Sequence, residues 1–135
     1  MEVSIKLVIW NDSLICGSCL AGKMNEWEEI VTYAQSLDQC FKIIYLFTPK
    51  KEDLNRLNVA LKTNQFDYPV FIDQSATFVK QNSKLPKNWQ LHSFLLDKNN
   101  KVVLVGNPLH NPPLWELYKS IIQKLIVHDG VLPAE

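Results

Sequence analysis

The sequence predicts an α/β fold in which helices cover both faces of a mixed β-sheet. Strand-like and helix-like segments alternate along the first two thirds of the chain, and a hairpin and a last helix follow. A strand–helix–strand unit pairs its strands in parallel through a right-handed crossover, whereas a hairpin pairs them antiparallel. The length of 135 residues is typical of one domain with a core of its own, so we expect a single domain over residues 1–135.

The first strand is predicted at 3–9, where apolar residues first alternate and then run together. A loop over 10–15 leads to Cys16-Gly17-Ser18-Cys19, and a helix is expected from about residue 18 to 36. Its apolar stripe, at three- and four-residue spacing, consists of Leu20, Met24, Trp27, Val31 and Ala34.

The nearly all-apolar segment 41–47 predicts a central strand. Thr48 offers an N-cap oxygen and Pro49 suits the first position of a second helix. The buried stripe of that helix consists of Leu54, Leu57 and Leu61.

The second half of the chain begins with a short strand at 68–73, which Pro69 restricts to a strand start or a sheet edge. One or two helical turns follow at 75–81, then a loop at 84–88. Strands at 91–96 and 102–105 flank an asparagine-rich turn at 97–101. Asn111 caps the last helix, and its inward residues are Leu114, Leu117, Tyr118, Ile121, Ile122 and Leu125.

Composition excludes several classes of function. Fourteen basic residues balance fourteen acidic ones, so the chain has no net field that would attract nucleic acid. No apolar run reaches the roughly 18–20 residues that span a bilayer, and no signal peptide is visible. We therefore expect no nucleic-acid partner and no membrane span in this chain.

Cys16 and Cys19 form the constellation with a chemical mechanism. The start of a helix presents unpaired N–H groups and a partial positive charge, which stabilise a thiolate on the first cysteine. The second cysteine, one turn later, can close a disulfide and release a partner. This spacing between a strand and a helix is typical of a redox-active dithiol.

Two other interpretations of the cysteine pair remain open. A zinc site needs four ligands, and the remaining candidates, Cys40, His92, His110 and His128, are not paired at ligand spacing. The two thiols could also be inert core residues. Cys40 follows a helix that is roughly 27 Å long at ~1.5 Å per residue, too far for a disulfide with either cysteine, and we expect it to be an apolar residue at a strand start.

Four segments resemble the thioredoxin-like superfamily, in the branch that contains the bacterial TlpA-type thiol-disulfide reductases and the peroxiredoxins. They are the strand ending at Trp10 before the cysteine pair, and segments 68–73, 94–97 and 102–106. The resemblance implies a thioredoxin-like three-layer α/β/α sandwich and electron exchange between a Cys16–Cys19 disulfide and protein partners. It also favours a periplasmic or membrane-anchored extracytoplasmic location. We expect no cofactor and no resident metal.

The sequence departs from the family pattern at two positions near the site. Leu91 stands where the family has a cis-proline that shapes the partner groove, and Gly22 stands where many TlpA-type proteins have a glutamate. The peroxiredoxin motif is missing as well, so peroxidase activity is not expected. These departures keep a second function open, a thioredoxin-like binding or scaffold domain with little or no redox turnover.

Other residues are interpreted from their positions. His92 could tune a thiolate or be a partly exposed residue at a strand start, and Leu91 would face the cysteines. Trp10 and Trp89 could line a groove, and Asp12 is the carboxylate nearest to Cys16 in sequence. Helical spacing places Trp27 and Trp115 in the core. A solvated helix face is expected for Glu26, Glu28 and Glu29, and loop or tail positions are expected for His110 and His128.

Overall fold

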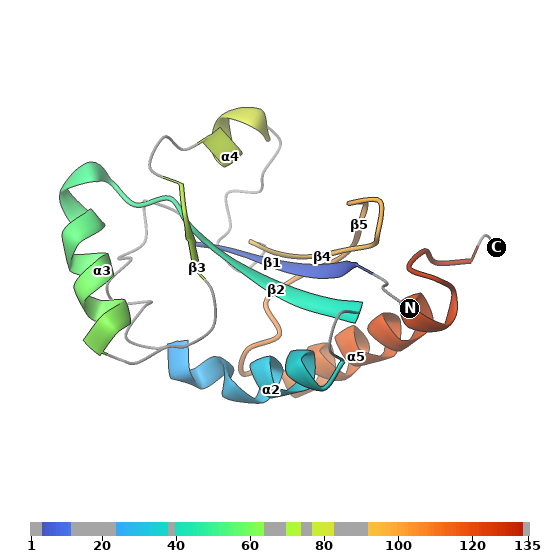
Figure 1. Cartoon of the computed structure of the whole chain (residues 1–135). Coiled ribbons are helices and arrows are strands. Elements are labelled where there is room, and N and C mark those ends of the chain that lie inside the picture. The colour runs from blue at the N-terminus through green and yellow to red at the C-terminus, as the bar shows by residue number, and fades with distance from the viewer. Residues whose placement is uncertain are drawn as a thin grey trace.

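A mixed sheet of five strands, in the order β3-β2-β1-β4-β5, forms the centre of the part of the chain that the structure describes (Figure 1). The structure is a computed structural model, and it describes residues 4–11, 24–37, 40–63, 70–73, 77–82 and 92–133. The strands are β1 (Ile5–Asn11), β2 (Phe41–Phe47), β3 (Val70–Ile72), β4 (Ser93–Leu96) and β5 (Val102–Val105).

The strand pairing confirms the predicted mixed topology. β1 pairs with β2 in parallel and β2 with β3 in parallel, while β1–β4 and β4–β5 are antiparallel. β4 therefore begins, and β5 ends, at the edge of the sheet where β1, β2 and β3 end. We call this edge the carboxyl edge.

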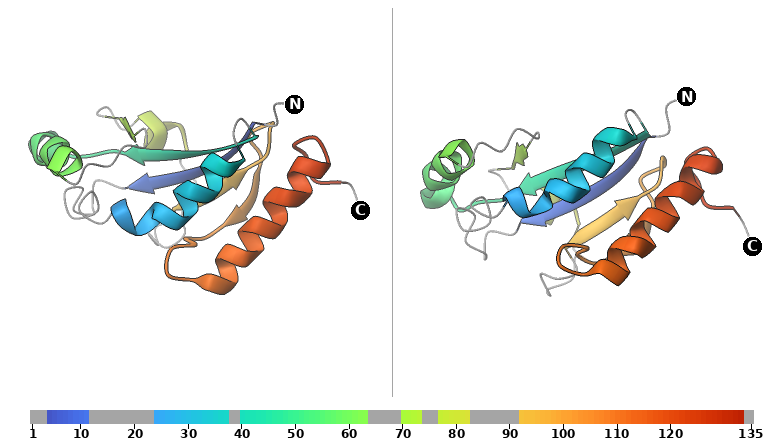
Figure 2. Two further views of the ribbon diagram at one scale, coloured as in Figure 1. Left: turned by 60° about the horizontal axis from the view of Figure 1, so that its bottom comes forward. Right: turned by 90° about the horizontal axis from the view of Figure 1, so that it is seen from below.

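The helices lie on both sides of the sheet. The short 3₁₀ helix η1 (Met24–Trp27) continues into α2 (Glu28–Ser36), and α2 lies beside α5 (Pro112–Val127) on one face (Figure 2). α4 (Thr77–Gln81) lies on the other face, and η3 (Lys51–Asp53) leads into α3 (Leu54–Thr63) near the β3 side (Figure 1). This arrangement confirms the α/β sandwich.

The main core lies between the sheet and the α2–α5 layer. Trp27 and Trp115 are buried in it, as predicted. Leu117, predicted to face inward, is instead 46% exposed, and α2 buries Ile30 more deeply than Val31. The buried stripe of α5 is therefore narrower than predicted, and the buried stripe of α2 is rotated from the predicted one. The buried side chains contributed by the strands are Ile5, Leu7, Ile9, Phe41, Ile43, Tyr45, Phe47 and Leu95.

β1 is longer at its carboxyl end than predicted. Trp10 and Asn11, expected in a loop, pair with Leu46 and Phe47 of β2. The backbone N–H of Trp10 also donates to the carbonyl of His92, at 2.9 Å. Pairing on both sides of Trp10, and on the β2 side of Asn11, thus extends the strand.

Thr48 does not cap the second helix, so that prediction was wrong. The helical segment after β2 begins at Lys51, with Lys50 at the N-cap position and no side-chain cap. Thr48 is 2% exposed, and its hydroxyl oxygen accepts a hydrogen bond from the indole N–H of Trp10 at 3.1 Å. A partner from a distant strand therefore occupies the oxygen that the prediction assigned to the helix.

The hairpin turn and the last helix follow the sequence prediction closely. Asn100 has a φ of 64°, and one carboxylate oxygen of Asp97 accepts from the N–H groups of Asn99 and Lys101. Asn111 caps α5 by accepting a hydrogen bond from Leu114 N at 3.3 Å, with Pro112 in the first turn.

Candidate active site

The carboxyl ends of the three parallel strands meet in a hydrogen-bonded network. Thr48 N donates to the carbonyl of Asn11 at 3.1 Å, and Asp73 N donates to the carbonyl of Phe47 at 2.8 Å. The Asn11 side chain donates to the carbonyl of Leu46 at 3.3 Å. Asn11, the last residue of β1 before the cysteine segment in the sequence, is therefore held to β2 and Thr48 by hydrogen bonds.

Asp12, Cys16, Cys19 and Leu91 lie outside the described residues, as does Trp89. Trp10 and His92 are described, and the structure brings them together although they are far apart in the sequence. Of the predicted site residues, these two define the edge from which the cysteine segment starts.

Trp10 lies on the face of the sheet opposite the main core. Its ring centroid is 4.2 Å from that of His92 and 5.6 Å from that of Phe78 in α4. The indole N–H donates to Thr48, and the residue is only 6% exposed. We call Trp10, Phe78 and His92 the aromatic wall. The Trp10 ring contacts both of the other rings.

His92 is buried, with 3% of its surface exposed, and directly precedes β4. The interpretation as a partly exposed histidine is therefore wrong. Its ring contacts that of Trp10, with the two ring planes tilted by 39°, because β4 runs antiparallel to β1 and the start of β4 lies beside the end of β1. Sequence spacing alone shows neither the burial nor the ring contact.

The β5–α5 connection lies at the same edge. Gly106, with a φ of 134°, donates its N–H to the carbonyl of Ser93 at 2.9 Å. Its own carbonyl accepts a hydrogen bond from the buried hydroxyl of Tyr118 in α5. Burial raises the pKa of Tyr118 well above its usual range, so this hydroxyl remains a neutral donor. The bend after β5 is thus fixed to both β4 and α5.

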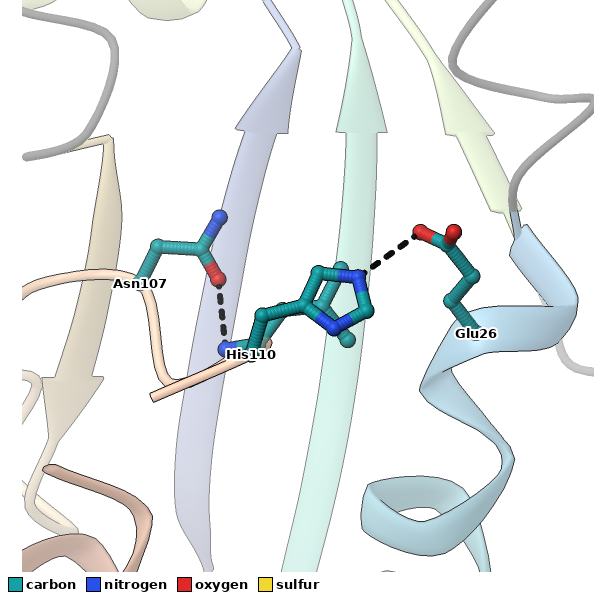
Figure 3. A network of polar contacts seen from close by, with 4 residues as sticks. Glu26, Asn107 and His110 are labelled. Atoms are coloured by element: carbon teal, nitrogen blue, oxygen red, sulfur yellow. Dashed lines mark hydrogen bonds and ion pairs between the residues drawn. The ribbon is translucent and has the colours of Figure 1, made fainter. Parts of the chain in front are cut away.

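Glu26 and His110 are functional candidates that the sequence analysis did not identify. His110 Nε2 lies 3.2 Å from Glu26 Oε2, and the two side chains point toward each other (Figure 3). His110 has a left-handed φ of 57°, and the preceding turn is held by Leu109 N, which donates to the Asn107 side chain at 2.9 Å. The expected loop position of His110 is confirmed. Glu26 was expected only on a solvated helix face, and the structure gives its side chain a specific partner in His110.

A pocket of about 380 Å³ lies beside this pair, between the start of α2 and the start of α5. Its charged lining includes Glu26, Glu29 and Glu116, and its apolar lining includes Ile30, Leu109 and Trp115. We call it the acidic pocket. Within the described ranges no group of three or more histidine, cysteine, aspartate or glutamate residues is placed to hold a metal ion.

Comparison with known proteins identifies the fold. The chain resembles a protein assigned as thiol:disulfide interchange protein DsbE from Chlorobium tepidum, with a TM-score of 0.63 at 16% identity, covering 88% of this chain and 80% of that one. It also resembles StoA from Bacillus subtilis (TM-score 0.55, 13% identity, 86% and 84% covered). A third similar structure is the exposed lipoprotein thioredoxin of Streptococcus pneumoniae (TM-score 0.51, 19% identity, 85% and 84% covered).

These similarities show that the chain has a thioredoxin-like fold. No protein-family model matches the sequence, and no curated protein matches it either. No helix among the described residues is long and apolar enough to cross a membrane.

Proposed function

We propose that the protein is a thiol-disulfide oxidoreductase that exchanges electrons with protein partners through Cys16 and Cys19. The observation that carries the proposal is the thioredoxin-like fold, in which a C-x-x-C motif follows the central strand β1. Cys16 is five residues beyond Asn11, so a chain rise of at most ~3.6 Å per residue keeps it within about 18 Å of the carboxyl edge.

The exchange proceeds in two balanced steps. The thiolate of Cys16 attacks one sulfur of a partner disulfide, the partner S–S bond breaks, and the released partner thiolate takes up a proton. The thiolate of Cys19 then attacks the Cys16 sulfur of the mixed disulfide and releases the second partner thiol. The partner is reduced by two electrons and the Cys16–Cys19 pair is oxidised. A protein electron donor of the dithiol class restores the dithiol by the reverse exchange.

The first experiment measures insulin reduction by dithiothreitol with and without the protein. We expect acceleration by the native chain and loss of the acceleration in Cys16→Ser, with Cys40→Ser as the matched control that keeps it. The potential of the pair indicates the direction of electron flow: about −270 mV corresponds to a thioredoxin-like reductant and about −120 mV to a DsbA-like oxidant. A native chain that leaves the reaction rate unchanged would refute the proposal.

We propose that His92 tunes the dithiol. It is buried at the carboxyl edge, directly after Leu91, the position at which the resemblance places the partner-facing proline. A protonated imidazole near Cys16 would stabilise the thiolate, so the Cys16 pKa should rise in His92→Ala. An unchanged thiolate titration at 240 nm, in a variant with native circular dichroism, would exclude this role.

The second candidate is a thioredoxin-like binding or scaffold domain with little turnover. It is favoured by Leu91 and Gly22, which stand in place of the proline and the glutamate of the resembled family. Leu91→Pro separates the two candidates, because restored partner access should speed insulin reduction only in a redox enzyme.

For location we propose an extracytoplasmic compartment, periplasmic or membrane-anchored. The support is the resemblance to extracytoplasmic thiol-disulfide reductases and the structural likeness to an exposed lipoprotein thioredoxin. Localisation of an epitope-tagged full-length protein by cell fractionation tests this proposal.

A further inference from the structure

The acidic pocket combines an apolar floor with a carboxylate rim. Trp115 and Ile30, which line it, are 5% and 4% exposed, so the floor is a fixed part of the core. Glu26, Glu29 and Glu116 are exposed residues on two different helical segments. A volume of about 380 Å³ falls within the range of roughly 300–1,000 Å³ that is usual for small-ligand sites.

The charges around the pocket favour a cation. Three of the described residues that line it are glutamates and none is lysine or arginine, while the lining residue His110 contacts Glu26. Lys119, which is outside the lining, shows the same chemistry: its Nζ lies 2.7 Å from Glu116 and 5.5 Å from the centroid of the Trp115 ring. Glu29 is the lining carboxylate for which no contact with a basic side chain is described. A carboxylate beside an aromatic face is a common environment for a cationic side chain.

We propose that the acidic pocket binds an arginine side chain of a partner polypeptide. A planar guanidinium presents five donors, so it can hydrogen-bond carboxylates on both α-helical segments, and its methylene stem can pack on the apolar floor. Lysine, a point charge with three donors, bridges separated carboxylates less well. The His110–Glu26 contact holds the β5–α5 loop beside the rim.

The pocket lies at the carboxyl edge, the edge at which β1 ends before the cysteine segment in the sequence. η1, which carries Glu26, follows the cysteine segment in the chain, and the loop that carries His110 leaves β5 at the carboxyl edge. We therefore expect the pocket to help select disulfide partners, and this role rests on the proposed function. The preference of the pocket for a guanidinium does not depend on the proposed function.

Binding is tested without redox chemistry in the full chain carrying Cys16→Ser and Cys19→Ser. The probe is acetyl-Gly-Arg-Gly-amide, compared with the same tripeptide carrying citrulline, a neutral isostere of arginine. We expect saturable NMR shifts at residues 26–30 and 109–116 and at the Trp115 indole, with citrulline bound about five-fold more weakly. Exposed ion pairs of ~0.2–1 kcal/mol each correspond to about 1.4- to 5-fold in affinity, and 0.5 M salt should reduce the difference.

Variants locate the site. Glu26→Gln combined with Glu29→Gln should weaken arginine binding about three- to ten-fold. Glu28→Gln and Glu52→Gln, exposed residues that do not line the pocket, should leave it unchanged. Equal binding of citrulline, shifts scattered over the surface, or no saturable shift would overturn the assignment.

A kinetic arm separates this inference from the proposed function. The native dithiol reacts with two disulfide-linked peptides that differ only in arginine or citrulline near the cysteine. Faster reduction of the arginine peptide, lost in the Glu26/Glu29 variant, supports a partner-selecting pocket. Equal reduction of both peptides refutes partner selection. Reduction of neither refutes the proposed function, and the NMR result then decides arginine binding by itself.

Discussion

The aromatic wall and the acidic pocket lie at the same edge of one sheet but on opposite faces, and they are built in different ways. Trp10 and His92 in the wall are 6% and 3% exposed, and the Trp10 N–H is hydrogen-bonded inside the protein. The side chains of Glu26 and His110 beside the pocket are 42% and 70% exposed. Loss of a large side chain from the wall should therefore act mainly on folding stability, and changes at the pocket rim mainly on binding.

The largest effect is expected for Trp10→Ala. Removing a buried aromatic side chain leaves a cavity and removes the ring contacts with His92 and Phe78, at a cost of about 3–5 kcal/mol in the free energy of unfolding. Phe71→Ala, on the same face but 53% exposed, should cost less than about 1 kcal/mol. Urea denaturation measures both, and similar losses would mean that the wall is not a buried unit.

Tyr118→Phe tests the hydrogen bonds that join β4, beside the aromatic wall, to α5, whose first turns line the acidic pocket. The hydroxyl of Tyr118 donates to Gly106, whose N–H donates to Ser93 beside the wall. Leaving the buried carbonyl without this donor should cost about 1–3 kcal/mol at neutral pH. Tyr33→Phe is the control, because its hydroxyl accepts from the Gln123 side chain in an exposed bond. A Tyr118→Phe chain as stable as the native one would remove this link.

The same tyrosine predicts an alkaline loss of stability. Burial raises the pKa of Tyr118 in the folded state, so above its unfolded pKa of about 10 the unfolded chain binds fewer protons than the folded one. The contribution of Tyr118 to the free energy of unfolding is fully present below pH 10. Above pH 10 the free energy of unfolding falls by up to about 1.4 kcal/mol per pH unit. Urea melts between pH 9 and 11 should show this extra slope in the native chain and not in Tyr118→Phe.

The smallest effects belong to the pocket rim. Glu26→Gln changes one partner of a polar contact between exposed side chains, and we expect less than about 0.5 kcal/mol of change in stability. His110→Asn keeps a residue that tolerates the left-handed φ of 57° while removing the imidazole, and it should be similarly neutral. A loss above about 1.5 kcal/mol from either change would show that the rim holds the fold together.

Sequence reasoning predicted the fold because local patterns and topology rules agree. Alternating and continuous apolar runs identified the strands, and the Asn111–Pro112 pair located the start of α5. The proposed dithiol also came from a local motif.

The features that the sequence did not indicate depend on contacts between distant residues. The hydrogen bond from Trp10 to Thr48 joins residues that are 38 positions apart, so the local sequence around Thr48 indicates a helix cap and not this partner. The ring contact of His92 with Trp10 and the pairing of His110 with Glu26 each join residues that are far apart in the sequence. A single sequence carries no periodic signal for such pairs.

The central place of β1 has a consequence for how the chain folds during synthesis. β1 is made before the other described strands, yet one of its two edges is covered by β4, which follows β2, α3, β3 and α4 in the chain. Until β4 has left the ribosome, the backbone N–H and C=O groups on one edge of β1 have no strand to pair with. Because β1 carries apolar residues on both faces, this edge can pair with a wrong strand. We therefore expect the slow step of folding to be the closure of the β1–β4 ladder, and the nascent chain to need shielding until then.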